Sequence, residues 1–213
     1  MLENFTPDSI KQKINSSKKS KLITYIVGGS ILAVLLFFTY RQFIWEPGNE
    51  KSKDGYWIAQ NYIAKDSTDK AIDVLVPFVK KNDGKIGGEM GQYLLATQYM
   101  KKGEFKKALT NLEGVSINDT YISVLSIGLQ GDCYSELKKY EQALALYMEA
   151  ADADDNEFTS PMYLFKAGGC ADQLDKFDKA IEIYTRIKDD YPTFANSKTI
   201  DKYIARASSY KAK

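Results

Sequence analysis

The hydrophobic pattern divides the chain into three parts. A polar, lysine-rich start is followed by residues 22–40, which carry no charged side chain, and then by a long stretch of mixed character. In a helix, the apolar stretch would span about 28 Å, close to the hydrocarbon thickness of a bilayer. The mixed part predicts paired helices that are separated by short polar turns.

A short phrase recurs four times in the mixed part, as an aromatic or small residue followed nine positions later by an alanine. The four pairs are Tyr62 with Ala71, Tyr99 with Ala108, Tyr134 with Ala143, and Ala171 with Ala180. Successive alanines lie 37, 35 and 37 residues apart. Repetition at this period predicts stacked helical hairpins, in which each unit buries its apolar face against its neighbours.

The sequence therefore predicts an all-α fold: one N-terminal membrane helix, an α-solenoid of about four helical hairpins, and a C-terminal capping helix. The predicted hairpin helices cover residues 54–65 and 68–81, 88–101 and 104–114, 121–137 and 140–152, and 159–174 and 177–190. A last helix is expected near 195–211. The segment from Glu46 to Gly55 is rich in helix breakers and predicts a short polar hinge.

The apolar stretch has the flanks of an uncleaved signal anchor. Five lysines precede it, and aromatic residues crowd its downstream end. By the positive-inside rule, the N-terminus is expected in the cytoplasm and the large C-terminal part across the membrane. The alternative is a cleaved signal peptide, which would have a shorter apolar core and a small-residue cleavage site; here Arg41-Gln-Phe-Ile-Trp45 follows instead.

Two pairs of small residues lie four positions apart within this stretch. They are Thr24 with Gly28 and Gly29 with Ala33. Such spacing lets a second helix approach closely in a membrane, so these residues are candidates for helix packing. The alternative is that small residues are simply common in membrane helices.

Composition excludes several kinds of function. The chain has no histidine and only two cysteines, Cys133 and Cys170, so the commonest acid–base catalyst and most zinc sites are missing. We expect no enzymatic activity, no catalytic residue, no metal and no cofactor. The part after the apolar stretch is slightly acidic and has no basic stripe, which argues against nucleic-acid binding. An acidic run from Asp152 to Glu157 is interpreted as a solvated loop rather than a cation site.

The third and fourth units carry a more detailed pattern. Numbered from residues 124 and 161, they place Gly131 and Gly168 at the eighth position, Cys133 and Cys170 at the tenth. Pro192 closes the fourth unit. With the Tyr–Ala pairs above, this pattern resembles the tetratricopeptide-repeat (TPR) family over residues 52–192. The second unit has Ala96 in place of the glycine, and the first departs most from the family.

The TPR resemblance implies a concave protein-binding face, lined by the second, fifth, ninth and twelfth positions of each first helix. In the four units these positions are Lys53, Tyr56, Gln60, Ile63; Met90, Tyr93, Thr97, Met100; Leu125, Gly128, Asp132, Ser135; and Met162, Phe165, Gly169, Asp172. The apolar members are the predicted binding groove: Tyr56, Ile63, Met90, Tyr93, Met100, Leu125, Met162 and Phe165. Alternatively, some of these side chains pack against the chain's own C-terminal helix.

The full layout is similar to the YfgM-type membrane-anchored TPR proteins of Gram-negative bacteria. That resemblance implies a cytoplasmic segment 1–21, a signal anchor 22–44 in the inner-membrane bilayer, a linker 45–53 and a periplasmic TPR domain 54–213. It also implies an ancillary subunit of the Sec translocon, with SecYEG and a PpiD-type membrane-anchored chaperone as partners and emerging secreted polypeptides as clients. The alternatives are an adaptor for other envelope machinery and a cytosol-facing TPR receptor.

Overall fold

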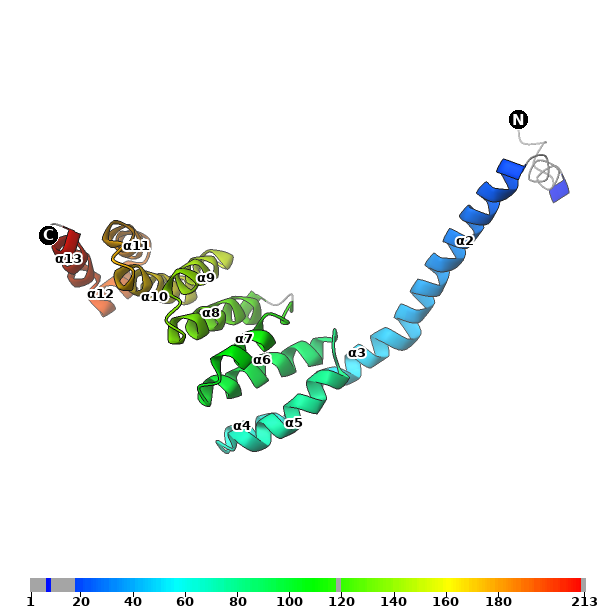
Figure 1. The fold of residues 1–213 in the computed structure, drawn as a ribbon, viewed down its shortest axis with the longest axis horizontal. Coiled ribbons are helices and arrows are strands. Elements are labelled where there is room, and N and C mark those ends of the chain that lie inside the picture. Colours follow the sequence, from blue (N-terminus) through cyan, green and yellow to red (C-terminus); the bar gives the residue numbers. More distant parts are fainter. Residues whose placement is uncertain (1–6, 9–17, 118–119, 212–213) are drawn as a thin grey trace. The chain divides into compact units, whose positions relative to one another are not determined.

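The computed structural model describes residues 7–8, 18–117 and 120–211, and over these residues it contains helices and turns but no strand (Figure 1). The chain divides into two compact units between Lys51 and Ser52. The helices are α2 (Lys18–Tyr40), the π-helix η1 (Arg41–Trp45), α3 (Glu46–Lys53), α4 (Trp57–Ala64), α5 (Thr68–Lys81), α6 (Ile86–Lys101), α7 (Phe105–Leu112), α8 (Thr120–Glu136), α9 (Tyr140–Ala153), α10 (Thr159–Gln173), α11 (Phe177–Asp190), α12 (Pro192–Lys198) and α13 (Ile200–Lys211). The predicted all-α solenoid is confirmed.

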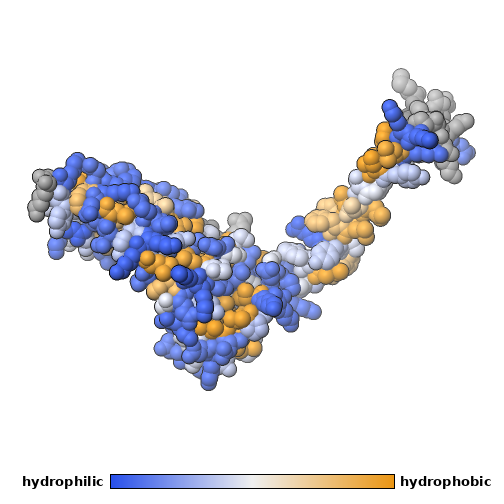
Figure 2. All heavy atoms as spheres, in the orientation of Figure 1, coloured by the Kyte–Doolittle hydropathy of each residue, from blue (hydrophilic) through white to orange (hydrophobic). Residues whose placement is uncertain are grey.

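In the first unit, α2 exposes apolar side chains along its length, and the orange spheres in Figure 2 show those on the visible face of this helix. Its most apolar 18-residue window has a mean hydropathy of 2.2 and no buried residue, so by length and composition this helix could cross a membrane. The hydroxyls of Ser30 and Thr39 donate to carbonyl oxygens one turn earlier, at 2.9 and 2.8 Å. This leaves neither hydroxyl without a partner in an apolar setting.

The predicted hinge after the apolar stretch is helical in the structure. Residues Arg41–Trp45 form a π-helix, in which the amide of Glu46 donates to the carbonyl of Arg41, and α3 follows directly. Pro47 cannot donate a backbone hydrogen bond, but it lies in the first turn of α3, beside a π-helical segment where the regular α-helical ladder is already interrupted. The hinge prediction was therefore wrong about local structure.

The second unit contains the four predicted hairpins. We call α4, α6, α8 and α10 the A helices, and α5, α7, α9 and α11 the B helices. Every observed helix end lies within three residues of its predicted position. Helices that follow one another along the chain pack together, so α5 touches α6, α7 touches α8, and α9 touches both α8 and α10. This arrangement is the stack that the sequence period predicts.

The turn inside each hairpin has the same geometry throughout the stack. Two residues after the end of each A helix lies a left-handed residue: Asp66, Gly103, Lys138 and Asp175. The next amide in each turn donates back to the carbonyl five residues earlier, at Tyr62, Tyr99, Tyr134 and Ala171. A left-handed residue with this bond satisfies the last carbonyls of the helix. The repeated aromatic or small residue is therefore also the acceptor of the turn.

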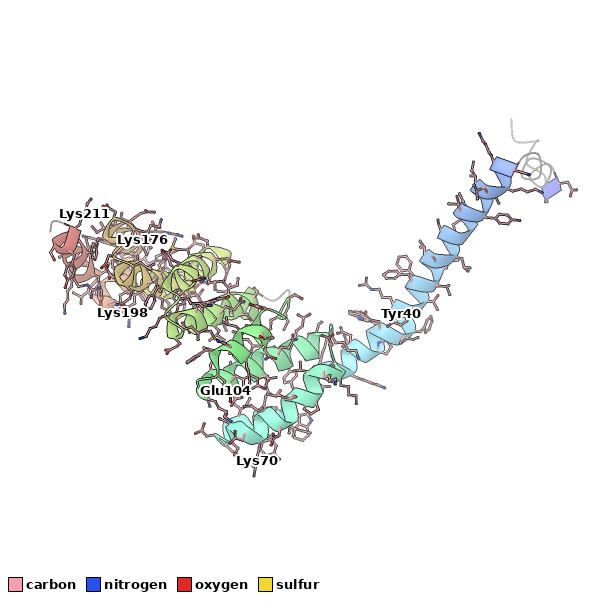
Figure 3. The ribbon with its side chains drawn as sticks, viewed as in Figure 1. Tyr40, Lys70, Glu104, Lys176, Lys198 and Lys211 are labelled. Atoms are coloured by element: carbon pink, nitrogen blue, oxygen red, sulfur yellow. The ribbon has the colours of Figure 1, made fainter. Side chains whose placement is uncertain are left out.

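Polar contacts between neighbouring hairpins follow the same period. Lys101 pairs with Asp66 at 3.1 Å, and Lys176, labelled in Figure 3, pairs with Glu141 at 2.8 Å. Both pairs join residues 35 positions apart. Because each hairpin contacts mainly its neighbours, the same offset recurs along the stack.

The C-terminal end differs from the single helix that we predicted. Residues after α11 form α12 and α13, separated by Thr199 at φ 55°. A β-branched residue rarely adopts this left-handed conformation, so the break has no glycine to signal it. Pro192 begins α12, where its missing amide proton costs no hydrogen bond.

Candidate functional site

A large cleft of the repeat stack lies on the surface formed by the A helices, which we call the A-face. Its volume is about 650 Å³. The residues that line it are Met100, Phe105, Asp132, Ser135, Glu136, Tyr140, Tyr147, Lys166, Gly169, Cys170 and Gln173. We call it the first cleft. It combines aromatic rings, a methionine and charged groups, as protein-binding grooves commonly do.

Asp132 lies at the centre of the first cleft. Its Oδ1 accepts a hydrogen bond from the hydroxyl of Tyr147 and another from the ammonium of Lys166, both at 2.6 Å. The Lys166 ammonium also lies over the rings of Tyr147 and Tyr163, 5.5 and 5.7 Å from their centroids. Two hairpins are thus joined by one ion pair, since Asp132 belongs to α8 and Lys166 to α10.

A second cleft, of about 300 Å³, repeats this arrangement one hairpin further along. It is lined by Asp172, Gln173, Asp175, Phe177, Arg206 and Tyr210. Asp172 accepts from the Tyr184 hydroxyl at 2.9 Å and pairs with Arg206 of α13. The Lys166–Asp132 and Arg206–Asp172 pairs both join residues 34 positions apart. By this offset, α13 occupies the place of a fifth A helix.

Both cysteines are buried free thiols, and Cys170 lines the first cleft. Burial, with a smaller effect of the Asp132 charge, raises the pKa of Cys133 to about 12. Burial also raises the pKa of Cys170 to about 11. A thiol with so high a pKa carries almost no thiolate at neutral pH and is a poor nucleophile.

The tyrosines that frame Asp132 are shifted in the same direction. Burial first, and then the hydrogen bond to Asp132, raises the pKa of the Tyr147 phenol far above its usual value. Burial, followed by the charge of Asp132, raises the pKa of Tyr163 to about 12. Both phenols are therefore neutral at physiological pH, and Tyr147 acts as a hydrogen-bond donor.

The eight predicted groove residues are all half-buried in the structure. Seven lie on A helices, and Tyr56 immediately precedes α4. Met100 alone among the eight lines the first cleft, where three other positions of the predicted concave face join it: Asp132, Ser135 and Gly169. The hollow part of the A-face is thus more polar than the eight apolar residues suggested.

Phe165 packs within its own chain. Its ring centroid lies 4.9 Å from that of Tyr203 in α13 and 6.3 Å from that of Phe194 in α12. Tyr184 of α11 lies 6.2 Å away. At this one groove position, the chain's C-terminal helices fill the space that a partner would otherwise use.

The repeat-signature residues form the internal contacts of the hairpins. Four alanines of the B helices are fully buried: Ala71, Ala108, Ala143 and Ala180. A Cβ added to Gly131 would lie 2.6 Å from the Tyr147 ring, and one added to Gly168 would overlap the Tyr184 ring. The small-residue pairs Thr24/Gly28 and Gly29/Ala33 lie on α2, where no described atom lies within 4 Å of a Cβ on either glycine.

The acidic run that begins at Asp152 makes structural contacts. Asp152 pairs with Arg186 at 2.8 Å, and Asp155 accepts from the hydroxyl of Tyr191. Asn156 Oδ1 accepts the amides of Phe158 and Thr159, at 2.9 and 2.7 Å, and so supports the start of α10. Within the described residues, no three metal-binding side chains converge.

Sequence reasoning missed several residues of the clefts. Outside the four concave positions that the family pattern supplies lie Glu136, Lys166, Gln173 and the aromatic residues that begin the last three B helices, Phe105, Tyr140 and Phe177. The sequence did contain a usable signal: in each of two pairs, an aspartate is followed 34 positions later, about one repeat length, by a basic residue.

Comparison with known proteins agrees with this architecture. Tetratricopeptide-repeat family models match residues 126–157 and residues 163–193. These two segments, which contain most of the third and fourth hairpins, are therefore tetratricopeptide repeats. Proteins with this repeat are generally non-catalytic scaffolds that bind other proteins. No curated protein matches the chain.

Solved structures share the fold at low identity. A crystal structure of MamA protein superimposes with a TM-score of 0.61 at 19% identity, over 78% of this chain and 83% of that one. Nearly identical TPR-like repeats from Podosopora anserina superimpose with a TM-score of 0.59 at 13% identity, over 77% and 88% of the two chains. The molecule is thus a TPR-type α-solenoid that follows an N-terminal apolar helix.

Proposed function

We propose that the protein is a non-enzymatic scaffold that is anchored in a membrane by α2 and binds other proteins on its A-face. The observation that carries this proposal is the first cleft, which gathers aromatic, methionine and charged side chains from three successive hairpins. The anchor is supported by an apolar helix with no buried side chain in its most apolar window. A helix that exposes this much apolar surface is unfavourable in water.

The finer proposal is an ancillary subunit of the Sec translocon in the bacterial inner membrane. In this proposal residues 1–21 are cytoplasmic, residues 54–213 are periplasmic, and SecYEG and a PpiD-type chaperone are the partners. Support comes from the order of the elements: lysine-rich start, apolar helix, four hairpins and two C-terminal helices. Anchoring would raise the local concentration of a weak binding face to about the millimolar range, so that clients bind and still leave.

Membrane orientation is tested by labelling single introduced cysteines. Glu149→Cys places a thiol on an exposed position of α9, and Lys19→Cys places one at the exposed start of α2. The native thiols are buried, so the protein without an introduced cysteine should stay unlabelled and serves as the control. In intact cells, a membrane-impermeant maleimide should label only the Glu149→Cys protein. Labelling of the Lys19→Cys protein alone would contradict the proposed topology.

The binding face is tested by photo-crosslinking in native membranes. A photoreactive amino acid at Met100, in the first cleft, should give crosslinks to SecYEG or to a PpiD-type chaperone. The same probe at Glu149, on the exposed side of a B helix, is the matched control. Crosslinks to another envelope assembly from Met100 alone would keep the scaffold role and remove the translocon assignment. Equal crosslinking from both positions would remove the A-face as the binding surface.

A further inference from the structure

The two clefts share a set of groups beyond the ion pairs described above. Each contains the aromatic residue that begins a B helix, Tyr140 in the first cleft and Phe177 in the second. Each has another aromatic residue in its wall, Phe105 or Tyr210. Phe177 and Tyr210 are stacked, with centroids 5.5 Å apart and an interplanar angle of 22°. Gln173 lines both clefts, so the two clefts are neighbours.

Each cleft also has one carboxylate that is left over after its ion pair. In the first cleft Lys166 is taken by Asp132, and in the second Arg206 is taken by Asp172. Glu136 and Asp175 remain, both exposed, and among the described residues neither has an ion-pair or hydrogen-bond partner for its side chain. The lining of each cleft therefore carries a net charge of −1 at neutral pH.

An unpaired carboxylate beside aromatic rings favours one kind of ligand group. Aromatic faces attract lysine and arginine side chains, and their aliphatic stems pack on apolar surface such as Met100 while the charged end stays near water. A neutral side chain would gain nothing from Glu136 or Asp175, and an acidic one would be repelled. Because Lys166 and Arg206 are already paired with aspartates, the cleft linings offer no free cation to an acidic ligand.

We propose that the two clefts are adjacent subsites for basic side chains of one extended polypeptide. This inference rests on the proposed function and names the chemistry of the partner segment. Helices in contact through their side chains lie about 10 Å apart. A chain in the extended polyproline II conformation advances about 3.1 Å per residue with three residues per turn, so every third side chain faces the same way. A segment with Lys or Arg at positions i and i+3 would therefore place one basic side chain in each cleft.

The test uses the full-length protein in nanodiscs of neutral lipid and fluorescently labelled short peptides. The first peptide has two lysines three positions apart among serine and leucine residues. In the others, both lysines are replaced by glutamine, both are replaced by glutamate, or the two lysines are adjacent. Binding is measured by fluorescence anisotropy at two salt concentrations. We expect the i, i+3 lysine peptide to bind about tenfold more tightly than the glutamine peptide, and the preference to shrink at high salt.

Two variants locate the effect. Glu136→Gln and Asp175→Asn should each weaken the lysine peptide about three- to fivefold and leave the glutamine peptide unchanged. Asparagine tolerates the left-handed backbone at position 175, so that change preserves the turn. Glu149→Gln on α9 and Asp189→Asn on α11 are the controls, because they remove the same charge from exposed positions of B helices.

The outcomes separate this inference from the proposed function. Equal binding of the lysine and glutamine peptides, tighter binding of the glutamate peptide, no binding of the lysine peptide, or equal losses in the control variants would each overturn it. Specific crosslinks from Met100 in such a case would leave the scaffold role intact. Loss of those crosslinks together with all peptide binding would remove both.

Discussion

The first two hairpins and the last two solve the same packing problem with different residues. In every hairpin a small residue of the A helix and a large residue of the B helix, 16 positions later, lie in the same part of the core. The pairs are Ala59 with Leu75, Ala96 with Leu112, Gly131 with Tyr147, and Gly168 with Tyr184. The smaller glycine accompanies the larger tyrosine, so the total volume is conserved as close packing requires.

The exchange of leucine for tyrosine has a consequence on the A-face. A tyrosine ring that crosses above glycine delivers its hydroxyl to Asp132 or Asp172, whereas leucine has no polar end. The polar centres of both clefts therefore arise only where the Gly–Tyr pair occurs. Core packing and the chemistry of the binding face are coupled in the C-terminal half and independent in the N-terminal half.

The largest expected effect comes from breaking this pair. Gly168→Ala adds a Cβ that overlaps the Tyr184 ring, which is itself fully buried. We expect a loss of about 2–3 kcal/mol in the free energy of unfolding, because overpacking outweighs the gain of about 1 kcal/mol in helix propensity. The measurement is urea unfolding of the full chain in detergent, followed by circular dichroism.

The control places the alanine–leucine pair of the first two hairpins in the fourth hairpin. Gly168→Ala combined with Tyr184→Leu recreates the Ala96–Leu112 pair, so the double variant should lose at least about 1 kcal/mol less than the two single losses together. Ala96→Gly in the second hairpin has no ring to relieve and should cost about 1 kcal/mol from propensity alone. If the stability loss of the double variant equals the sum of the two single losses, the alanine–leucine pair is not equivalent to the glycine–tyrosine pair.

Alkaline pH should weaken the C-terminal hairpins next. At the tenth position the third and fourth units bury Cys133 and Cys170, where the second buries Gln98. Burial raises the pKa of the two thiols from 9.0 to about 12 and about 11. Their contribution to stability is complete below pH 9 and is lost as the pH rises toward 11–12, because the unfolded state gives up these protons first.

At pH 10 this linkage corresponds to about 1 kcal/mol for each thiol. Unfolding midpoints measured between pH 7 and pH 10.5 should therefore fall. The Cys133→Ala and Cys170→Ala double variant should lose less stability over the same pH interval. An equal fall in both proteins would assign the alkaline sensitivity to other groups, such as the buried tyrosines.

Helix ends in the stack could be predicted from the sequence because each repeat contains its own turn signals. The 37-, 35- and 37-residue spacing of the alanines located all four hairpins to within three residues. The sequence failed where a local signal was absent or misleading. Pro47 and Gly48 predicted a hinge in a segment that is helical, and Thr199 breaks the last helix without a glycine.

The A-face could be placed on the right helices but not shaped. Family positions identify which residues of an A helix face the groove, yet they do not tell how neighbouring hairpins fill it. Phe165 is covered by Phe194 and Tyr203, and the hollow is instead made with Lys166 and Glu136. These features depend on contacts between units about one repeat apart in the chain, which a position-by-position pattern does not contain.

A smaller effect is expected when the Gly–Tyr packing is kept and only the hydrogen bond of the tyrosine hydroxyl is removed. Tyr147→Phe keeps the ring above Gly131 but removes the hydroxyl that donates to Asp132 at 2.6 Å. Loss of one half-buried hydrogen bond to a charged group should cost about 1–2 kcal/mol. Tyr62→Phe, in the first hairpin, is the control and should cost less than about 0.5 kcal/mol, because no hydrogen bond from its hydroxyl is found among the described residues.

The smallest effect concerns the hairpin turns, where the second and third hairpins use the same geometry with different residues. Gly103 adopts the left-handed conformation without strain, whereas Lys138 holds it at φ 57° with a side chain. Lys138→Gly should raise the free energy of unfolding by about 0.5–1 kcal/mol, because the strain of a Cβ in this region exceeds the added entropy of the unfolded chain. Gly103→Ala should lower it by a similar amount. Thermal unfolding of both variants measures the two changes in stability. A destabilised Lys138→Gly protein would show that the exposed lysine side chain stabilises the third hairpin by a contact that outweighs its backbone strain.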